Sequence, residues 1–213
     1  MNTKKRKKLK FQSLAIIALF SLSGVFAGYF FGKLLKHTPQ FTQHIDVLTW
    51  WDLMILPFSF LLVLAIHEAG HLLGGFSRGM RFLLYIVGPF QLSQTQSGIR
   101  FNWIFNLGTF GGLAAATPDP NKPLRSQFLN LIAGGPLASI LLAIICFSTL
   151  FFVDGRLFAH LAMIGLMSLF IFIVTAIPSQ LGGMMSDGKQ FLEVIGGGDA
   201  VLVRQKFSAV IAQ

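Results

Sequence analysis

The sequence predicts an all-α integral membrane protein with about four transmembrane helices and a membrane-associated, strand-like segment between the second and third helices. Hydrophobic residues make up 54% of the 213 residues and charged residues only 12%, a balance outside that of soluble domains. The apolar residues gather in several runs of about 20 residues, the length that crosses a bilayer as a helix. A chain of this size could not bury such runs in a soluble core.

The net charge of +9 does not indicate a nucleic acid partner, because the basic residues follow the loops instead of clustering on one face. The lipid bilayer is the partner that this composition predicts. The single cysteine, Cys146, lies in an apolar run, so the chain can form neither an internal disulfide nor a thiolate metal site. Nothing in the sequence indicates an oligomeric state.

The first predicted span covers residues 11–31 and follows a basic head, so that residues 1–32 form one N-terminal unit. The positive-inside rule places this head in the cytosol. A cleaved signal peptide is the alternative, because Val25-Phe26-Ala27 offers small residues of the kind that a signal peptidase prefers. The apolar run continues past these residues, which favours a retained helix.

Three further spans are predicted at about 53–76, 127–152 and 157–177. Trp50 and Trp51 precede the second span as interfacial anchors. The segment between the second and third spans is cytosolic or lies against the inner leaflet. Within it, the patches R-F-L-L-Y-I-V and I-R-F-N-W-I-F resemble strands around Gln96-Ser97-Gly98.

The distribution of Lys and Arg supports four spans with both termini in the cytosol. Of the seventeen, six lie in the head, five in residues 77–125 and three after residue 178, whereas only Lys33, Lys36 and Arg156 fall on the outer side. This topology, together with the lack of disulfides, is typical of a bacterial plasma membrane protein.

His67-Glu68-Ala69-Gly70-His71 forms an H-E-x-x-H motif in the inner half of the second span. Residues four apart share one helical face, so both imidazoles can bind one zinc ion while the glutamate acts as a base. With five histidines and two glutamates in the chain, a chance match is expected about once in a thousand such chains. The alternative is a structural pair that hydrogen-bonds across helices.

A hydrolytic zinc site uses three protein ligands and keeps one open position. The predicted topology leaves four acidic residues on the inner side, Asp119, Asp187, Glu193 and Asp199. Asp187 follows the fourth span most closely, and Gly188 after it permits tight backbone packing. The alternative role for Asp187 is to cap a helix over residues 188–195. Asp119 is the next candidate ligand.

Three stretches together resemble the signatures of the site-2 protease family of zinc intramembrane metalloproteases. They are the H-E-A-G-H motif, Gly135-x-x-x-Ser139, and Pro178 followed by Ser186-Asp187-Gly188. The resemblance covers residues of about 53 to 190 and implies a metalloprotease membrane core at 33–190 and a cytosolic tail at 191–213. It implies a short form of the family, because residues 77–125 are too few for an inserted peptide-binding domain.

The resemblance implies that His67, His71 and Asp187 bind Zn²⁺ and that Glu68 activates a water molecule. The family often has an asparagine three residues before the proline of its last motif, where this chain has Thr175. The residue that stabilises the transition state therefore stays open. The candidates for a transition-state or substrate contact are Thr175, Gln180 and Ser139.

Two hypotheses for function follow. The first is a zinc endopeptidase that cleaves membrane-spanning or signal-peptide-like substrates near the cytosolic face, with an unwound substrate added as a strand to residues 81–106. A plain cover for the active site is the alternative role of that segment. The second hypothesis is a non-catalytic, protease-like membrane protein that acts as a partner in peptide export or immunity. The intact Glu68 favours catalysis.

The charge distribution makes a testable prediction about topology. Reporter fusions after Lys36 and Gly155 should report an external position, and fusions after Gln96 and Gln213 an internal one, because cytosolic loops retain the basic residues. An external signal at Gln96 would contradict the four-span topology and the cytosolic position of the site.

Overall fold

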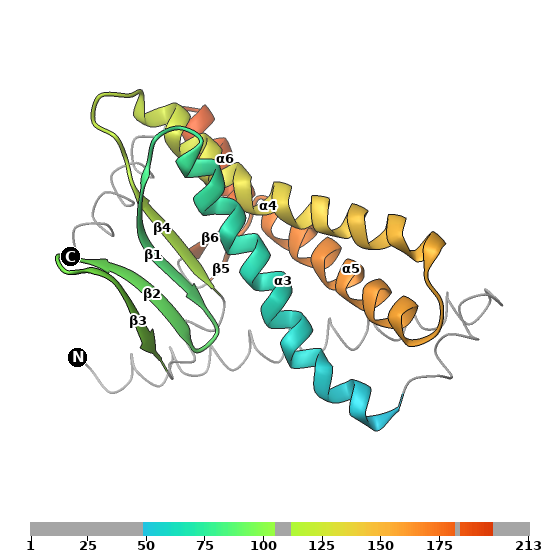
Figure 1. Ribbon diagram of the computed structural model, residues 1–213. Coiled ribbons are helices and arrows are strands. Elements are labelled where there is room, and N and C mark those ends of the chain that lie inside the picture. Colours follow the sequence, from blue (N-terminus) through green and yellow to red (C-terminus); the bar gives the residue numbers. More distant parts are fainter. Residues whose placement is uncertain (1–48, 105–111, 182–183, 198–213) are drawn as a thin grey trace, which may run out of the picture.

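The computed structural model describes residues 49–104, 112–181 and 184–197. Within these residues, three long helices lie against one another, and a four-stranded antiparallel sheet flanks one end of them (Figure 1). The predicted first span at 11–31, with its basic head and its signal-peptide alternative, lies outside the described residues.

The three long helices are α3 (Trp50–Phe76), α4 (Leu124–Thr149), which the 3₁₀ turn η2 (Leu150–Phe152) extends, and α5 (Gly155–Ala176). Each is long and apolar enough to cross a membrane, and they coincide with the second, third and fourth predicted spans. Large apolar side chains point away from the bundle, among them Phe58 and Leu137, which are 72% and 62% exposed. This outward apolar surface is what helices in contact with lipid require.

The all-α fold class is wrong, because β1 (Arg81–Val87), β2 (Phe90–Thr95), β3 (Gly98–Trp103) and β4 (Leu113–Thr117) form one sheet in the order β3-β2-β1-β4. Strands β1 and β3 lie where the two strand-like patches were predicted. Strand β4 reads L-A-A-A-T; its three alanines show no alternation, and Thr117 is its one residue of the β-branched or aromatic kind that marks a strand. Tertiary pairing with β1, not local propensity, makes it a strand.

The sheet lies beside the end of the bundle where α3 ends and α4 begins (Figure 1), and a hydrophobic core joins the sheet to the helices there. This core gathers side chains from α3, α4, the β-strands and the last helix. Its buried members are Leu72, Met80, Ala116, Phe128, Leu131, Ile132 and Val194. Burial of a side chain of this size contributes about 1.5–3 kcal/mol, so the core fixes the sheet and the last helix against α4.

After α5 the chain forms a small hairpin of β5 (Gln180–Leu181) and β6 (Met184–Met185) and then helix α6 (Asp187–Ile195). Ser186 caps α6, because its hydroxyl accepts a hydrogen bond from the Lys189 amide. Gly188 packs directly on the backbone of Ala176 at the end of α5, where an added methyl group would overlap the Ala176 carbonyl oxygen. The predicted tight packing at Gly188 is thereby confirmed.

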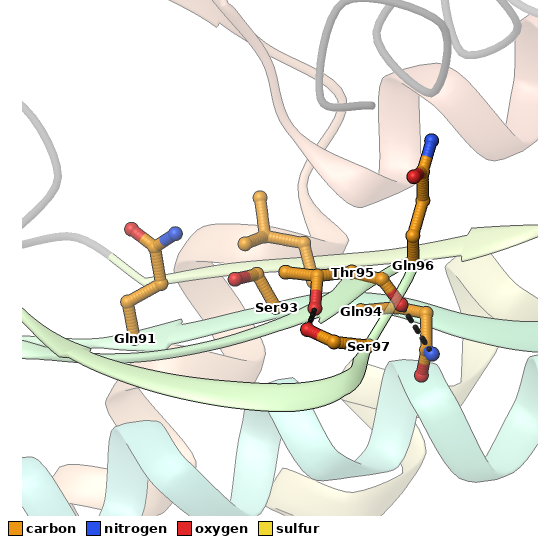
Figure 2. Close-up of a pocket in the computed structure, with 7 residues that line it drawn as sticks. Gln91, Ser93, Gln94, Thr95, Gln96 and Ser97 are labelled. Atoms are coloured by element: carbon orange, nitrogen blue, oxygen red, sulfur yellow. Dashed lines mark hydrogen bonds between the residues drawn. The ribbon is translucent and has the colours of Figure 1, made fainter.

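An open depression of about 520 Å³ lies over β2 and the β2–β3 turn (Figure 2). Its lining is mainly Gln, Ser and Thr, but several of these groups hold the turn itself. Thr95 Oγ1 lies 2.7 Å from the Gly98 carbonyl oxygen and 3.1 Å from Ser97 Oγ, and Gln94 Nε2 donates to the Thr95 carbonyl. The depression is therefore a consequence of hairpin geometry.

Helices α3 and α4 cross at glycines. Gly70 and Gly74 of α3 face Gly134 and Asn130 of α4 so closely that a methyl group on any of the three glycines would overlap backbone atoms of the other helix. Small residues spaced four apart allow this close approach in membrane helices. The crossing brings the C-terminal half of α3 directly against the backbone of α4.

Gly74→Ala should therefore destabilise the protein, because the added methyl group meets the Asn130 carbonyl and must push the helices apart. We expect a loss of about 1–3 kcal/mol, the usual cost of overpacking, seen as a lower midpoint of thermal unfolding in detergent. Gly196→Ala is the matched control, since a methyl group there meets no atom closer than 3.3 Å. An unchanged midpoint for Gly74→Ala would contradict the close crossing.

Candidate metal centre

The three polar residues of the H-E-x-x-H motif are all buried in the C-terminal half of α3. His67, Glu68 and His71 are 3%, 7% and 9% exposed. The helical spacing sets the two imidazole rings at right angles, with their centroids 4.8 Å apart. Their Nε2 atoms converge to 3.2 Å.

Asp187 joins the two histidines from the first turn of α6. Its Oδ2 atom lies 3.3 Å from His67 Nε2 and 3.5 Å from His71 Nε2. Among the described residues, these three form the group of His, Cys, Asp and Glu ligand atoms that could hold a metal ion. The three atoms form a nearly equilateral triangle.

This triangle has the dimensions of one face of a tetrahedral metal site. Around an ion with ligand distances of about 2.0–2.1 Å, as for zinc, tetrahedral ligand atoms lie about 3.3 Å apart. In addition, Asp187 Oδ2 is buried and makes no hydrogen bond within the described structure that satisfies normal geometry. A buried carboxylate oxygen without such a bond, set between two imidazole nitrogens, fits a bound cation.

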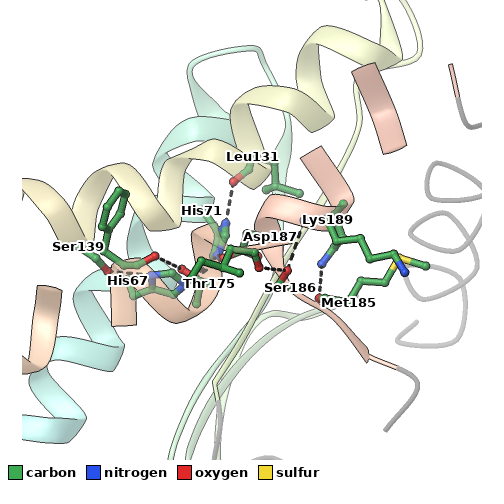
Figure 3. Close-up of polar contacts among 12 residues, drawn as sticks. His67, His71, Leu131, Ser139, Thr175, Met185, Ser186, Asp187 and Lys189 are labelled. Carbon is green, nitrogen blue, oxygen red and sulfur yellow. Dashed lines mark hydrogen bonds and ion pairs between the residues drawn. The ribbon is translucent and has the colours of Figure 1, made fainter. Parts of the chain in front are cut away.

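One stripe of α4 supports both imidazole rings from behind (Figure 3). His71 Nδ1 donates to the Leu131 carbonyl at 2.7 Å, and His67 Nδ1 lies 2.9 Å from Ser139 Oγ. Between them stands Gly135, where a methyl group would overlap the His71 ring. The Gly135-x-x-x-Ser139 spacing therefore matches the His67-x-x-x-His71 spacing, and each α4 residue contacts one imidazole.

Glu68 lies on the side of α3 that faces the sheet. The Ala114 backbone amide of β4 hydrogen-bonds to its carboxylate, and a methyl group on Gly112 would overlap that carboxylate. Tyr85 of β1 donates to the Ala65 carbonyl at 2.8 Å, and burial together with the nearby Glu68 charge raises the pKa of Tyr85. The sheet thus encloses Glu68 from the side opposite the bundle.

The two histidines keep the Asp187 side chain ionised. Burial disfavours its ionised form, but the close imidazoles of His67 and His71 and their charge outweigh burial and lower the pKa of Asp187 to about 2. Asp187 is therefore a carboxylate at every physiological pH. An ionised oxygen is the form that binds a cation.

The other acidic candidates do not approach the histidines. Asp119 pairs with Lys122 at 3.8 Å and accepts from the Asn121 amide in its own loop, and Asp199 lies outside the described residues. Glu193 belongs to α6 but does not join the ligand group. The alternative role of Asp187 as a helix cap is taken by Ser186.

The three candidates for a transition-state or substrate contact make other bonds. Thr175 Oγ1 lies 3.4 Å from the Phe172 carbonyl of its own helix, and Gln180 Oε1 accepts from Lys189 Nζ at 2.6 Å. Ser139 contacts His67.

The sequence did not predict the two neighbours of Glu68, which are Gly112 and Ala114. The Gly111-Gly112 pair was nevertheless a visible signal of close packing in the sequence.

The chain matches the family model of peptidase family M50 over residues 55–210. The match spans the metal ligand group and all three signature stretches, and it confirms the resemblance to site-2 proteases. No curated protein and no solved structure matches the chain.

Asp187→Ala should reduce metal affinity steeply, because it leaves two imidazoles and removes the only carboxylate of the ligand group. The measurement is a titration of the purified protein in detergent with zinc, in parallel with thermal unfolding. Asp119→Ala and Glu193→Ala are the controls and should bind zinc with the same affinity as the unmodified protein. Full occupancy in Asp187→Ala would mean that the third ligand lies elsewhere.

Proposed function

The chain belongs to peptidase family M50, and from that membership we propose that it is a zinc endopeptidase that cleaves membrane-spanning or signal-peptide-like substrates near the cytosolic face of a membrane. The observation that carries the proposal is Glu68, which is buried beside the group of His67, His71 and Asp187. A protein that only binds a partner has no need of a buried base at this position.

Zinc suits the ligand group, because two imidazole nitrogens and one carboxylate oxygen are a donor set of hydrolytic zinc sites. Three protein ligands leave one position open. When bound, zinc supplies Lewis acidity, which polarises a carbonyl and lowers the pKa of water from 15.7 to about 7. The ligands His67, His71 and Asp187 would keep this charge within reach of Glu68.

Glu68 would act as the general base that accepts a proton from the attacking water and passes it to the leaving amine. Its carboxylate is restrained by the Ala114 amide and enclosed by Gly112. This restraint supports the role, because a base is effective only when it is held within hydrogen-bond reach of the reacting water.

The substrate must expose a backbone amide, since a transmembrane helix hides its amides in internal hydrogen bonds. Strand β4 is an outer strand of the sheet and carries Ala114 next to Glu68. An unwound substrate segment paired with β4 would bring its scissile carbonyl close to the base. The sequence interpretation used residues 81–106 for this pairing; the contact at Ala114 favours β4 instead. A plain cover for the site remains the alternative role of the sheet.

A bacterial plasma membrane with both termini in the cytosol is the proposed location. The distribution of basic residues along the sequence supports it. The sheet and α6 lie at the end of the bundle that this topology assigns to the cytosol (Figure 1). Substrates would therefore be cut at or near the inner leaflet.

Glu68→Gln separates chemistry from metal binding. The amide keeps the size of the side chain but cannot accept a proton, so turnover should fall by about 10²–10⁴-fold, the usual contribution of a general base. Zinc content should stay near one ion per chain, because Glu68 is not a ligand in the proposed site. The measurements are hydrolysis of a membrane peptide in detergent and elemental analysis of the same sample.

Glu193→Gln is the matched control for this experiment, since it makes the same substitution in the other glutamate of the chain. It should leave turnover unchanged. A Glu68→Gln protein as active as the unmodified one would remove Glu68 from the mechanism. Absence of any turnover in the zinc-loaded unmodified protein would favour the non-catalytic role in peptide export or immunity.

A further inference from the structure

Ser139 places a hydroxyl in the middle of an apolar helix bundle. The residue is 1% exposed, and its Oγ atom lies 2.9 Å from His67 Nδ1. A polar group at this depth is expensive unless it is hydrogen-bonded. The hydrogen bond to His67 therefore offsets the cost of burying the Ser139 hydroxyl. It is made by Nδ1, the imidazole nitrogen that does not face Asp187.

The chemistry of coordination gives this bond a direction. A histidine that binds a metal through Nε2 carries its proton on Nδ1, so Nδ1 needs an acceptor. For His71 the acceptor is the Leu131 carbonyl, which can only accept and so fixes the tautomer. For His67 the partner is the Ser139 hydroxyl, which can accept the same proton.

A mutation can remove the hydrogen-bond partner of His67 but not that of His71. The Leu131 carbonyl is backbone and persists in every variant, whereas the Ser139 hydroxyl is a side chain. The orientation of His67 therefore depends on the identity of residue 139. The orientation of His71 does not depend on a side chain in this way, because its partner is a backbone carbonyl.

We propose that Ser139 is a positioning residue that holds the His67 imidazole with Nε2 directed at the metal site. This inference rests on the proposed function and replaces the expectation that Ser139 contacts the substrate. Its hydroxyl contacts the side of the ring away from Asp187 and is covered by the bundle, so it cannot reach a peptide bound at the metal.

Ser168 on α5 offers a matched control. It is 0% exposed, and its hydroxyl donates to the Ser139 backbone carbonyl at 2.8 Å. Ser168→Ala therefore removes one buried hydroxyl and one hydrogen bond from the same place in the bundle, but leaves the contact between Ser139 and His67 in place. Any difference between the two alanine variants isolates that contact.

The experiment compares zinc affinity in the unmodified full chain, Ser139→Ala, Ser139→Thr and Ser168→Ala, by competition with a chelator in detergent. Loss of a partner that orients a ligating histidine lowers metal affinity about 10–100-fold, which is the result expected for Ser139→Ala. Ser139→Thr retains the hydroxyl and should restore most of the affinity. Ser168→Ala should bind zinc with an affinity within about threefold of that of the unmodified protein. This change is smaller than the loss expected when an orienting partner is removed.

Cobalt as a spectroscopic probe adds a readout that a purely structural role would not change. The d–d absorption of bound Co²⁺ reports ligand geometry and should shift in Ser139→Ala but not in Ser168→Ala. Alanine is a good helix former, and thermal unfolding of the metal-free variants checks that each is folded. The Ser139→Thr comparison tests the same contact if Ser139→Ala fails to fold, since a large loss of affinity in the folded threonine variant would contradict the role of the hydroxyl.

Four outcomes separate this inference from the proposed function. Unchanged zinc affinity in Ser139→Ala would overturn the positioning role alone, and so would an equal loss in Ser168→Ala. An unmodified protein that binds no zinc would overturn the proposed function, and the positioning role with it. Zinc binding that depends on Ser139 in a protein without peptidase activity would support the positioning role and contradict the proposed catalysis.

Discussion

The close crossing of α3 and α4 is the constraint on which the site depends. Because Gly70, Gly74 and Gly134 carry no side chains at the crossing, the backbone of α4 lies directly behind the two histidines of α3. A wider separation of the two helices would move both the Leu131 carbonyl and the Ser139 hydroxyl away from the imidazoles that they contact. The glycines therefore shape the candidate metal centre although they contact none of its potential ligand atoms.

A second constraint brings Asp187, the third member of the candidate ligand group, to the same place from a distant part of the sequence. Helix α6 is fixed at its start by the packing of Gly188 on Ala176 and at its end by Arg125, whose guanidinium donates to the Ile195 carbonyl. Val194 completes the attachment in the inner core. With both ends held, the first turn of α6 can present Asp187 only toward α3.

The sequence predicted the parts of this arrangement that follow from local spacing. The three described spans follow from the length of apolar runs, the shared face of His67 and His71 from helical periodicity, and Asp187 from its position after the last span. The all-α fold class missed the sheet. Strand β4 in particular forms because it pairs with β1, and its three alanines give no local sign of a strand. The Leu131 carbonyl could not be predicted either, since a backbone atom has no sequence signature, whereas Ser139 was visible but was given a different role.

His67 and His71 come from α3 and Asp187 from α6, so a metal ion held by all three would link metal binding to the stability of this end of the bundle. The Asp187 carboxylate and the two imidazoles lie together in a buried region beside Glu68. A cation bound by all three ligands would bind only the state in which α6 is docked, and so would stabilise that state by mass action. The shared core of α6, the sheet and α4 would carry this stabilisation to β4, so the strand beside Glu68 would be most firmly fixed with a metal bound.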